Sequence, residues 1–386
     1  MRQVIRKAIA NAYNIDTSPI IYTLIVDGNN LLKISSVDKR LNGKNEEYGI
    51  VYQFLWQIKN ILQKRDFNFC YVMWDGEKSG QLRYQYYQDY KISRGKTYEI
   101  SGSKSEYDKQ IESYCKKVID YHKKNNKKEV KREETDEENF ERQQNILFSA
   151  LEELFVRQVI CDEVEGDDLI AYYVKNKKPN EKIVIISGDR DLTQLISDDV
   201  CVYIPSLKKF ITPDNHIKEI GYTHENVLIK KMICGDNSDS IKGIKGVGEK
   251  TFFDLFPEAK TSKMDLESIL RRSQELIDER IANKKKPLES TKNIINRVTI
   301  GCQGKDIYEI NKKIIDLKEP LLTKEAKEEL DALIHAPLDP ENRSFKNLYT
   351  IIQENDMVDL LDEGKFSNFF SAYHKLIDNE VKYYNS

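Results

Sequence analysis

The fold is decided between residues 162 and 195, which read D-E-V-E-G-D-D-L-I-A-Y-Y-V (162–174) and, after a short spacer, K-I-V-I-I-S-G-D-R-D-L-T-Q-L (182–195). The apolar residues from Leu169 onward predict a helix, and the β-branched run 183–186 predicts a buried strand. The ends of these two elements would be neighbours in an α/β fold. The acids at those ends are Glu165, Asp167, Asp168, Asp189 and Asp191.

Acids gathered in this way need a cation. Two unit charges about 4 Å apart repel by about 4 kcal/mol near a protein surface. A group of carboxylates therefore stays ionised only with positive charge between its members. Divalent metal ions meet that need, and oxygen ligands without His or Cys favour Mg²⁺ over zinc. Taken singly, Asp167, Asp168 or Asp191 could instead cap a helix, but the pattern as a whole favours metal.

Two earlier stretches repeat the pattern of a strand that ends in an acid. The apolar run 20–26 is followed by Asp27, and the run 67–74 is followed by Asp75. An amphipathic helix at 50–62 separates them, so the strands are expected in one parallel sheet. A turn-forming Asp after one strand is ordinary, but several of them should meet at the carboxyl edge of the sheet, where ligands bind.

Composition limits the classes of function. The 386 residues are 32% charged with a net charge of −3, so two domains are expected and any nucleic-acid binding must come from local basic patches. The six cysteines are scattered without a C-x-x-C pair, which is typical of free thiols in a reducing compartment. No apolar run reaches about 18 residues and no signal peptide is visible, so we expect a cytoplasmic protein without membrane contact.

A first basic patch follows Asp75. Between residues 76 and 96, cationic side chains alternate with tyrosines, a pattern that suits binding of single strands or strand ends. A solvated helix with a tyrosine packing face explains the same pattern. The residues concerned are Arg83, Lys91 and Arg94 with Tyr87 and Tyr90.

A second basic patch surrounds a glycine hairpin between two predicted helices, the first beginning near Glu225 and the second ending near Phe256. Glycines at such a turn let backbone N–H groups face a phosphate. Asp236 and Asp239 lie just upstream. The candidate nucleic-acid ligands are Lys242, Gly243, Lys245, Gly246, Gly248 and Lys250.

The remaining segments are less informative. Residues 1–19 predict an N-terminal helical extension, and the strongly charged residues from 95 to 145 predict an exposed insertion. The chain from 258 onward is predominantly helical. We expect the boundary between an α/β core (20–222) and a second region (223–386) near residue 222. Phenylalanines 366, 369 and 370 could form a clamp-binding peptide, although packing of a helix explains them better.

The motifs taken together resemble those of the 5′-nuclease superfamily, most closely the T-even phage ribonuclease H branch. The resemblance covers about residues 20–255. It implies an α/β, PIN-like parallel-sheet core, a helical arch at 95–145, a helix-hairpin-helix (H3TH) region and a helical C-terminal extension. The motifs are D-G-N-N (27–30), W-D-G (74–76), R-x₆-Y-K-x-x-R (83–94), E-G-D-D (165–168), G-D-R-D (188–191) and G-D-N-S-D-S-I-K-G-I-K-G-V-G (235–248).

The resemblance also implies roles for single residues. Lys91 and Arg94, with Arg83 in the same motif, would act on the scissile phosphate. The glycine hairpin would hold duplex DNA and bind K⁺ through its carbonyls. The ligands of a first metal would be Asp27, Asp75, Glu165 and Asp167, and those of a second would be Asp168, Asp189, Asp191, Asp236 and Asp239.

The expected function is a 5′–3′ exonuclease or flap endonuclease that uses two Mg²⁺ ions, with Mn²⁺ as a substitute. Its substrates would be DNA with 5′ ends or flaps and RNA–DNA primer hybrids. A sliding clamp or single-strand-binding protein would be a partner of the monomer.

Two alternative functions remain open. One is an RNase of the PIN type, which the glycine hairpin does not favour. The other is a non-catalytic DNA-binding protein on the same fold, which the full set of acids does not favour.

Overall fold

The computed structural model describes residues 19–94, 135–299, 306–338, 343–361 and 363–385. Its centre is a sheet with the strand order β3-β2-β1-β4-β5-β6. All neighbouring strands are parallel except β6, which pairs antiparallel with β5. The strands are β1 (Ile21–Asp27), β2 (Phe69–Asp75), β3 (Arg157–Cys161), β4 (Glu181–Ile186), β5 (Val200–Ile204) and β6 (Lys209–Ile211).

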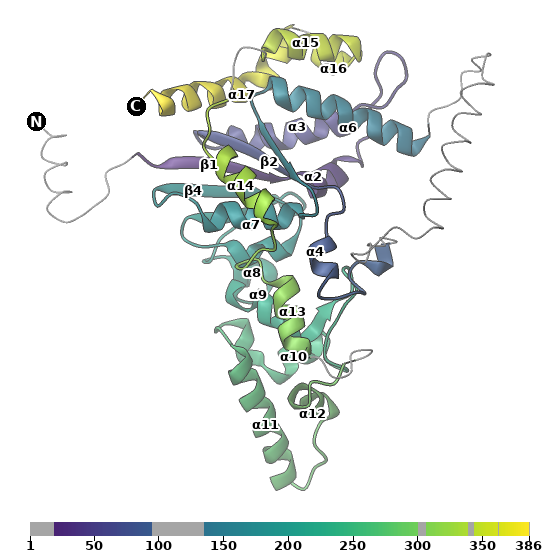
Figure 1. The fold of residues 1–386 in the computed structure, drawn as a ribbon, viewed down its shortest axis with the longest axis vertical. Coiled ribbons are helices and arrows are strands. Elements are labelled where there is room, and N and C mark those ends of the chain that lie inside the picture. Colours follow the sequence, from purple (N-terminus) through teal and green to yellow (C-terminus); the bar gives the residue numbers. More distant parts are fainter. Residues whose placement is uncertain (1–18, 95–134, 300–305, 339–342, 362, 386) are drawn as a thin grey trace, which may run out of the picture.

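Helices cover both faces of this sheet (Figure 1). The central strands β1, β2 and β4 are nearly continuous apolar runs, as parallel strands buried on both faces require. On one face, α2 (Gly28–Ser35), α3 (Gly49–Leu62) and α6 (Asp136–Glu153) pack against Leu24, Val26 and their neighbours. On the other, α7 (Gly166–Lys175) and the 3₁₀ helix η2 (Arg190–Leu195) cover residues such as Ile25.

A second, smaller core lies beyond β6. Its elements pack around Phe252, Phe256 and Ile294. In Figure 1, α11 and α12 project away from the sheet. The elements between β6 and residue 295 are α8 (His216–Ile220), which packs against the α/β core, and η3 (His224–Asn226), α9 (Val227–Cys234), β7 (Gly235–Asp236), β8 (Ile241–Lys242), α10 (Glu249–Leu255), η4 (Pro257–Lys260), α11 (Leu266–Ala282) and α12 (Glu289–Ile295).

The first C-terminal helix joins the second core through Ile307 and Tyr308, and the later ones return to the α/β core. Phe370 and Tyr373 are fully buried in the same cluster as α3, and the Tyr373 hydroxyl donates to the carbonyl of Leu55 at 2.8 Å. The expected boundary near residue 222 therefore does not separate two packing units. The burial of Phe369 and Phe370 also rules out a clamp-binding peptide at this place. The helices are α13 (Ile307–Ile315), α14 (Lys324–Leu333), α15 (Phe345–Glu354), α16 (Val358–Leu361) and α17 (Glu363–Tyr384).

Further boundaries differ from the sequence prediction. The strand β3 and the helix α2 were not predicted. Residues 136–145, expected in the arch, belong to α6, where Gln143 is buried and accepts a hydrogen bond from the backbone N–H of Ile50. The rest of the expected arch, 95–134, and residues 1–18 lie outside the described residues. Among the helices that are described, none combines the length and apolarity needed to cross a membrane.

Candidate active site

Three acids meet at the carboxyl edge of the sheet, as the sequence predicts. Asp27 is the last residue of β1, Asp75 is the last residue of β2, and Asp189 follows β4 after a short turn. Hydrogen bonds through Ser187 join Asp27 and Asp189. The hydroxyl of Ser187 donates to Asp27 at 2.6 Å and accepts from the backbone N–H of Asp189 at 2.9 Å. Ser187 was not predicted as a site residue.

Glu165 and Asp167, at the start of α7, complete this group. The backbone N–H of Gly166 donates to the Asp75 carboxylate at 2.8 Å, which fixes the helix start beside β2. Burial, followed by the negative charges of Asp27 and Asp189, raises the pKa of Asp167 well above its ordinary range. Burial also raises the pKa of Asp27 to about 7, with Asp189 and Asp75 contributing. These carboxylates are close enough to repel one another strongly.

Two lysines neutralise the acids at the rim of the group. Lys91 pairs with Glu165, and Lys231 on α9 pairs with both Asp191 and Asp236. Burial disfavours the ionised form of Asp236, yet Lys231 lowers the pKa of Asp236 to about 2. For Asp191, burial and the charge of Asp189 outweigh Lys231 and raise the pKa to about 6. Lys231 was not predicted, because only the fold brings α9 to η2.

A small cavity of about 30 Å³ lies among these side chains and has room for an ion or a water molecule. Across the described residues, no three acid, His or Cys side chains already converge on one point as metal ligands. Glu165, Asp191 and Asp236 are each paired with a lysine instead. The donors are all oxygens, and the repulsion among them is uncompensated at Asp27 and Asp167. This chemistry fits hard divalent cations that would draw the carboxylates together. The acids lining the cavity are Glu165, Asp167, Asp191, Asp236 and Asp239.

Asp168 does not belong to the acid group, which corrects its expected role as a metal ligand. Its carboxylate is 1% exposed and both oxygens are paired with Arg83, one of them at 3.1 Å. The same carboxylate accepts from the backbone N–H of Leu321 at 3.0 Å. All these partners are protein groups, so Asp168 stabilises the fold under the site.

Arg83, in turn, is a positioning residue and not a group that contacts substrate. Its guanidinium is 6% exposed and lies 2.8 Å from Glu165 while it pairs with Asp168. Its Nε donates to the carbonyl of Ile314 at 2.8 Å. The expected catalytic role of Arg83 is therefore wrong. Arg83 holds Glu165 in place and ties α13 to the site.

The two tyrosines of the first basic patch are also buried. Tyr87 and Tyr90 are 4% and 2% exposed, so neither ring is available to stack on a base, and their expected nucleic-acid contacts are wrong. The Tyr90 hydroxyl donates to Glu165 at 2.8 Å, which gives this residue a place in the site. The alternative of a tyrosine packing face holds for both. The side chain of Arg94 lies outside the described residues.

The glycine hairpin stands beside the acid group with its lysines toward solvent. Lys245, Gly246, Gly248 and Lys250 are exposed. Gly246 has φ +79° with open space around it, a conformation that other residues rarely adopt.

The end of α12 holds the backbone of this hairpin. Asn293 donates to the carbonyl of Lys245 at 2.9 Å, and the backbone N–H of Lys245 donates to the carbonyl of Val298 at 2.9 Å. Thr299 donates to the carbonyl of Gly243 at 2.8 Å. Lys242 differs from the other lysines of the hairpin, because it pairs with Asp89 at 3.3 Å. The hairpin is thus a fixed, partly basic turn.

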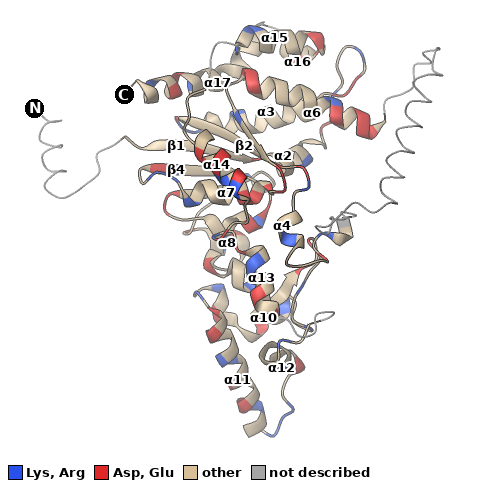
Figure 2. Ribbon diagram, viewed as in Figure 1, with Lys and Arg blue, Asp and Glu red and all other residues tan. Residues whose placement is uncertain are grey.

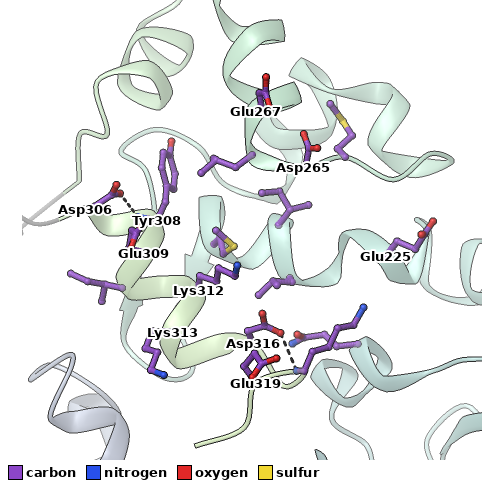
Figure 3. Close-up of a pocket in the computed structure, with 18 of the residues that line it drawn as sticks. Glu225, Asp265, Glu267, Asp306, Tyr308, Glu309, Lys312, Lys313, Asp316 and Glu319 are labelled. Atoms are coloured by element: carbon purple, nitrogen blue, oxygen red, sulfur yellow. Dashed lines mark hydrogen bonds between the residues drawn. The ribbon is translucent and has the colours of Figure 1, made fainter. Parts of the chain in front are cut away.

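A larger cavity of about 1130 Å³ lies between α9, the start of α11 and α13, away from the acid group. Figure 3 shows acidic side chains such as Asp265 and Asp316 around it together with Lys312 and Lys313. Such a mixed lining selects no class of ligand. The acid group is therefore the candidate active site.

Known proteins are similar to this chain in sequence and in fold. The family model described as the 5′-3′ exonuclease N-terminal resolvase-like domain matches residues 22–226. DNA polymerase I of Bacillus subtilis is 34% identical over 144 residues, which are 36% of this chain and 16% of that protein. The 5′-3′ exonuclease of Aquifex aeolicus is 31% identical over 161 residues, which are 42% of this chain and 53% of that protein. The chain thus spans between about a sixth and about half the length of these relatives.

Two solved structures of bacteriophage T5 proteins have a similar fold. The T5 5′-exonuclease with bound zinc gives a TM-score of 0.52 at 17% identity, covering 86% of this chain and 98% of that one. A variant of the T5 flap endonuclease with DNA and metal ions gives 0.52 at 16% identity, covering 92% and 99%. At this level of identity the likeness concerns the fold alone.

Proposed function

The chain belongs to the 5′-3′ exonuclease family, and on that premise we propose that it is a Mg²⁺-dependent, structure-specific 5′ nuclease. It would act as a 5′–3′ exonuclease or flap endonuclease in DNA replication or repair. The products would carry 5′-phosphate and 3′-hydroxyl ends. DNA with 5′ ends or flaps would be its substrate, and RNA–DNA primer hybrids would be a second one.

The observation that carries the proposal is the crowding of Asp27, Asp167 and Asp189 at one edge of the sheet, where no side chain of the described residues forms an ion pair with Asp27 or Asp167. An uncompensated group of this kind destabilises the metal-free fold, and such a cost is typical of functional sites. Two Mg²⁺ ions, with Mn²⁺ as a substitute, would supply Lewis-acid activation of water and of the phosphodiester.

The chain's own residues would position the substrate. Lys91 is buried and pairs with Glu165 in this metal-free structure, so it would hold the scissile phosphate only once metal and substrate engage Glu165. We propose that Arg94 shares this task. Arg83 and Tyr90 position Glu165 through an ion pair and a hydrogen bond.

The glycine hairpin supports a substrate with a duplex part. The exposed Lys245 and Lys250 would meet phosphates of the duplex, and K⁺ would bind at the hairpin carbonyls. These exposed lysines favour a 5′ nuclease that holds duplex DNA over an RNase of the PIN type. We further propose a cytoplasmic monomer, in the host cytoplasm if phage-encoded, with a sliding clamp or single-strand-binding protein as partner.

Mapping of the cleavage products tests the proposal. A labelled 5′ flap, a nicked duplex and an RNA–DNA hybrid are incubated with the protein, with Mg²⁺ or with a chelator. Cleavage is expected only with Mg²⁺, and only near 5′ ends or flap junctions. Cleavage of single-stranded RNA in preference to every duplex substrate would favour the PIN-type RNase. Duplex binding without any cleavage would favour the non-catalytic protein.

The variant Lys245→Ala tests the role of the hairpin. Removing one phosphate contact should weaken binding to duplexes of all sequences and reduce the slope of log K against log salt by about 0.9. The measurement is a salt titration of binding to a 5′-flap duplex. Lys218→Ala, an exposed lysine on α8, is the matched control and should leave the slope unchanged. An equal slope for Lys245→Ala and wild type would exclude a phosphate contact at this residue.

A further inference from the structure

The pair of helices α11 and α12 forms an arm with a basic tip. Residues 283–288 connect the two helices, and three consecutive lysines among them, Lys284, Lys285 and Lys286, are exposed. Figure 2 shows this blue loop at the end of the molecule farthest from the sheet. Within the described part of the chain, none of these three lysines has a carboxylate partner.

The body of the arm differs from its tip, because its charges are paired. Arg272 bonds to Glu275 at 3.2 Å and to Glu279 at 2.9 Å, and Arg271 lies 4.0 Å from Glu275. Positive charge that lacks a partner is therefore concentrated at the tip. Charge placed in this way attracts a polyanion more strongly than the same charge neutralised along a helix.

The tip is also held in a defined shape. The backbone N–H of Lys285 donates to the carbonyl of Arg280 at 2.8 Å, and Nε of Arg280 donates to the carbonyl of Lys286 at 2.8 Å. The backbone therefore presents the lysines from a closed turn. A turn ordered before binding loses little conformational entropy when it meets a ligand.

The other end of the arm is fixed to the glycine hairpin by the hydrogen bonds of Asn293 and Val298 to Lys245. From Lys286 to Asn293 the chain runs through three residues outside a helix and five in α12. At about 3.3 Å and 1.5 Å per residue, this spans at most about 18 Å. Since B-DNA rises 3.4 Å per base pair, the tip lies within about five base pairs of the hairpin.

We propose that the tip of the arm is a second phosphate-binding site for the same DNA duplex that the glycine hairpin holds. The duplex would lie along the arm, with Lys245 and Lys250 at one end and Lys284–Lys286 at the other. The arm carries no aromatic side chain, so base stacking is not its task and its contacts are independent of sequence. The inference rests on the proposed function, since it requires the hairpin to hold duplex DNA.

Binding to duplex arms of increasing length tests the inference. The probes are 5′-flap substrates whose duplex arms grow in steps of about two base pairs, and the measured quantity is the salt slope of the binding constant. For wild type, the slope should rise once the duplex reaches the tip. For Lys285→Ala/Lys286→Ala, it should be lower by up to about 1.8 on long arms and equal to wild type on short ones.

Three controls make the result decisive. The variant Lys324→Ala/Lys327→Ala removes two exposed lysines from α14 and should match wild type at every length. Charge reversal, Lys285→Glu/Lys286→Glu, should enlarge the loss on long arms only. Lys245→Ala should lower the slope at all lengths.

The outcomes separate the two proposals. If wild type binds and cleaves flaps while the tip variants keep the wild-type slope at every length, the tip does not contact duplex DNA and this inference is overturned alone. If wild type shows no binding to any flap, the proposed function itself fails. Equal losses on short and long arms would also overturn the inference, since they would place the lysines elsewhere on the substrate.

Discussion

Asp167→Asn should abolish Mg²⁺-dependent cleavage and, at the same time, raise the melting temperature of the metal-free protein at neutral pH. Asp167 is crowded by Asp27 and Asp189, and burial together with this repulsion raises its pKa well above the ordinary range. An uncharged amide of the same size removes the repulsion from the fold. It also removes a proposed metal ligand, for which we expect a loss of cleavage of at least about 100-fold.

Two measurements check this prediction: single-turnover cleavage of a 5′ flap, and thermal unfolding in chelator. Binding of the flap to the variant should stay close to wild type, because the hairpin is unchanged. Asp162→Asn is the control, since Asp162 is an exposed acid just before the same motif and should alter neither quantity. Full Mg²⁺-dependent cleavage by Asp167→Asn would remove this residue from the proposed site. A lower melting temperature would show that its charge is compensated.

Asp168→Asn, one residue further on, should have the opposite effect on stability. The substitution removes one of the two carboxylates that pair with the buried guanidinium of Arg83 and leaves Glu165 as the other. Full loss of the partner from a buried ion pair costs about 3–5 kcal/mol, which is the upper bound here. We therefore expect a clear fall in the free energy of unfolding, and a loss of cleavage that follows from the displacement of Glu165.

A double-mutant cycle with Arg83→Met measures this pair. Chemical denaturation of wild type, Asp168→Asn, Arg83→Met and the double variant gives the coupling energy. If the pair is structural, the double variant should be more stable than the sum of the single losses predicts. Additive losses would contradict the pairing. Cleavage lost without any loss of stability in Asp168→Asn would restore its role as a metal ligand.

The contrast between Asp167 and Asp168 shows which features of the site could be predicted from the sequence. The strand-end acids Asp27, Asp75 and Asp189 were predictable, because parallel strands deliver their carboxyl ends to one edge. The motif around Asp167 and Asp168 was recognisable as acidic, but neighbouring positions on a helix point about 100° apart. Which of them faces the site depends on the partner that each meets, and Arg83 lies 85 residues away from Asp168.

Contacts between distant segments also explain the other differences between the predicted and the observed site. The tyrosines of the first basic patch could stack on bases or pack inside, and local sequence does not distinguish the two. Their burial depends on residues of β8 and α13, such as Ile241 and Ile314, which share a cluster with Tyr87 and Tyr90. Lys231 meets Asp191 only because α9 packs beside η2. Contacts between distant segments follow from the assembled fold and not from the pattern of one stretch.

The packing of α17 against α3 has a consequence for synthesis on the ribosome. The residues that match the family model end at 226, yet the core on one face of the sheet is completed by Leu376. The 150 residues between 226 and 376 take about 8–30 s to translate at about 5–20 residues per second. During that interval the nascent chain carries all the strand-end acids but exposes the apolar surface of α3. The proposed nuclease activity should therefore appear only after this delay.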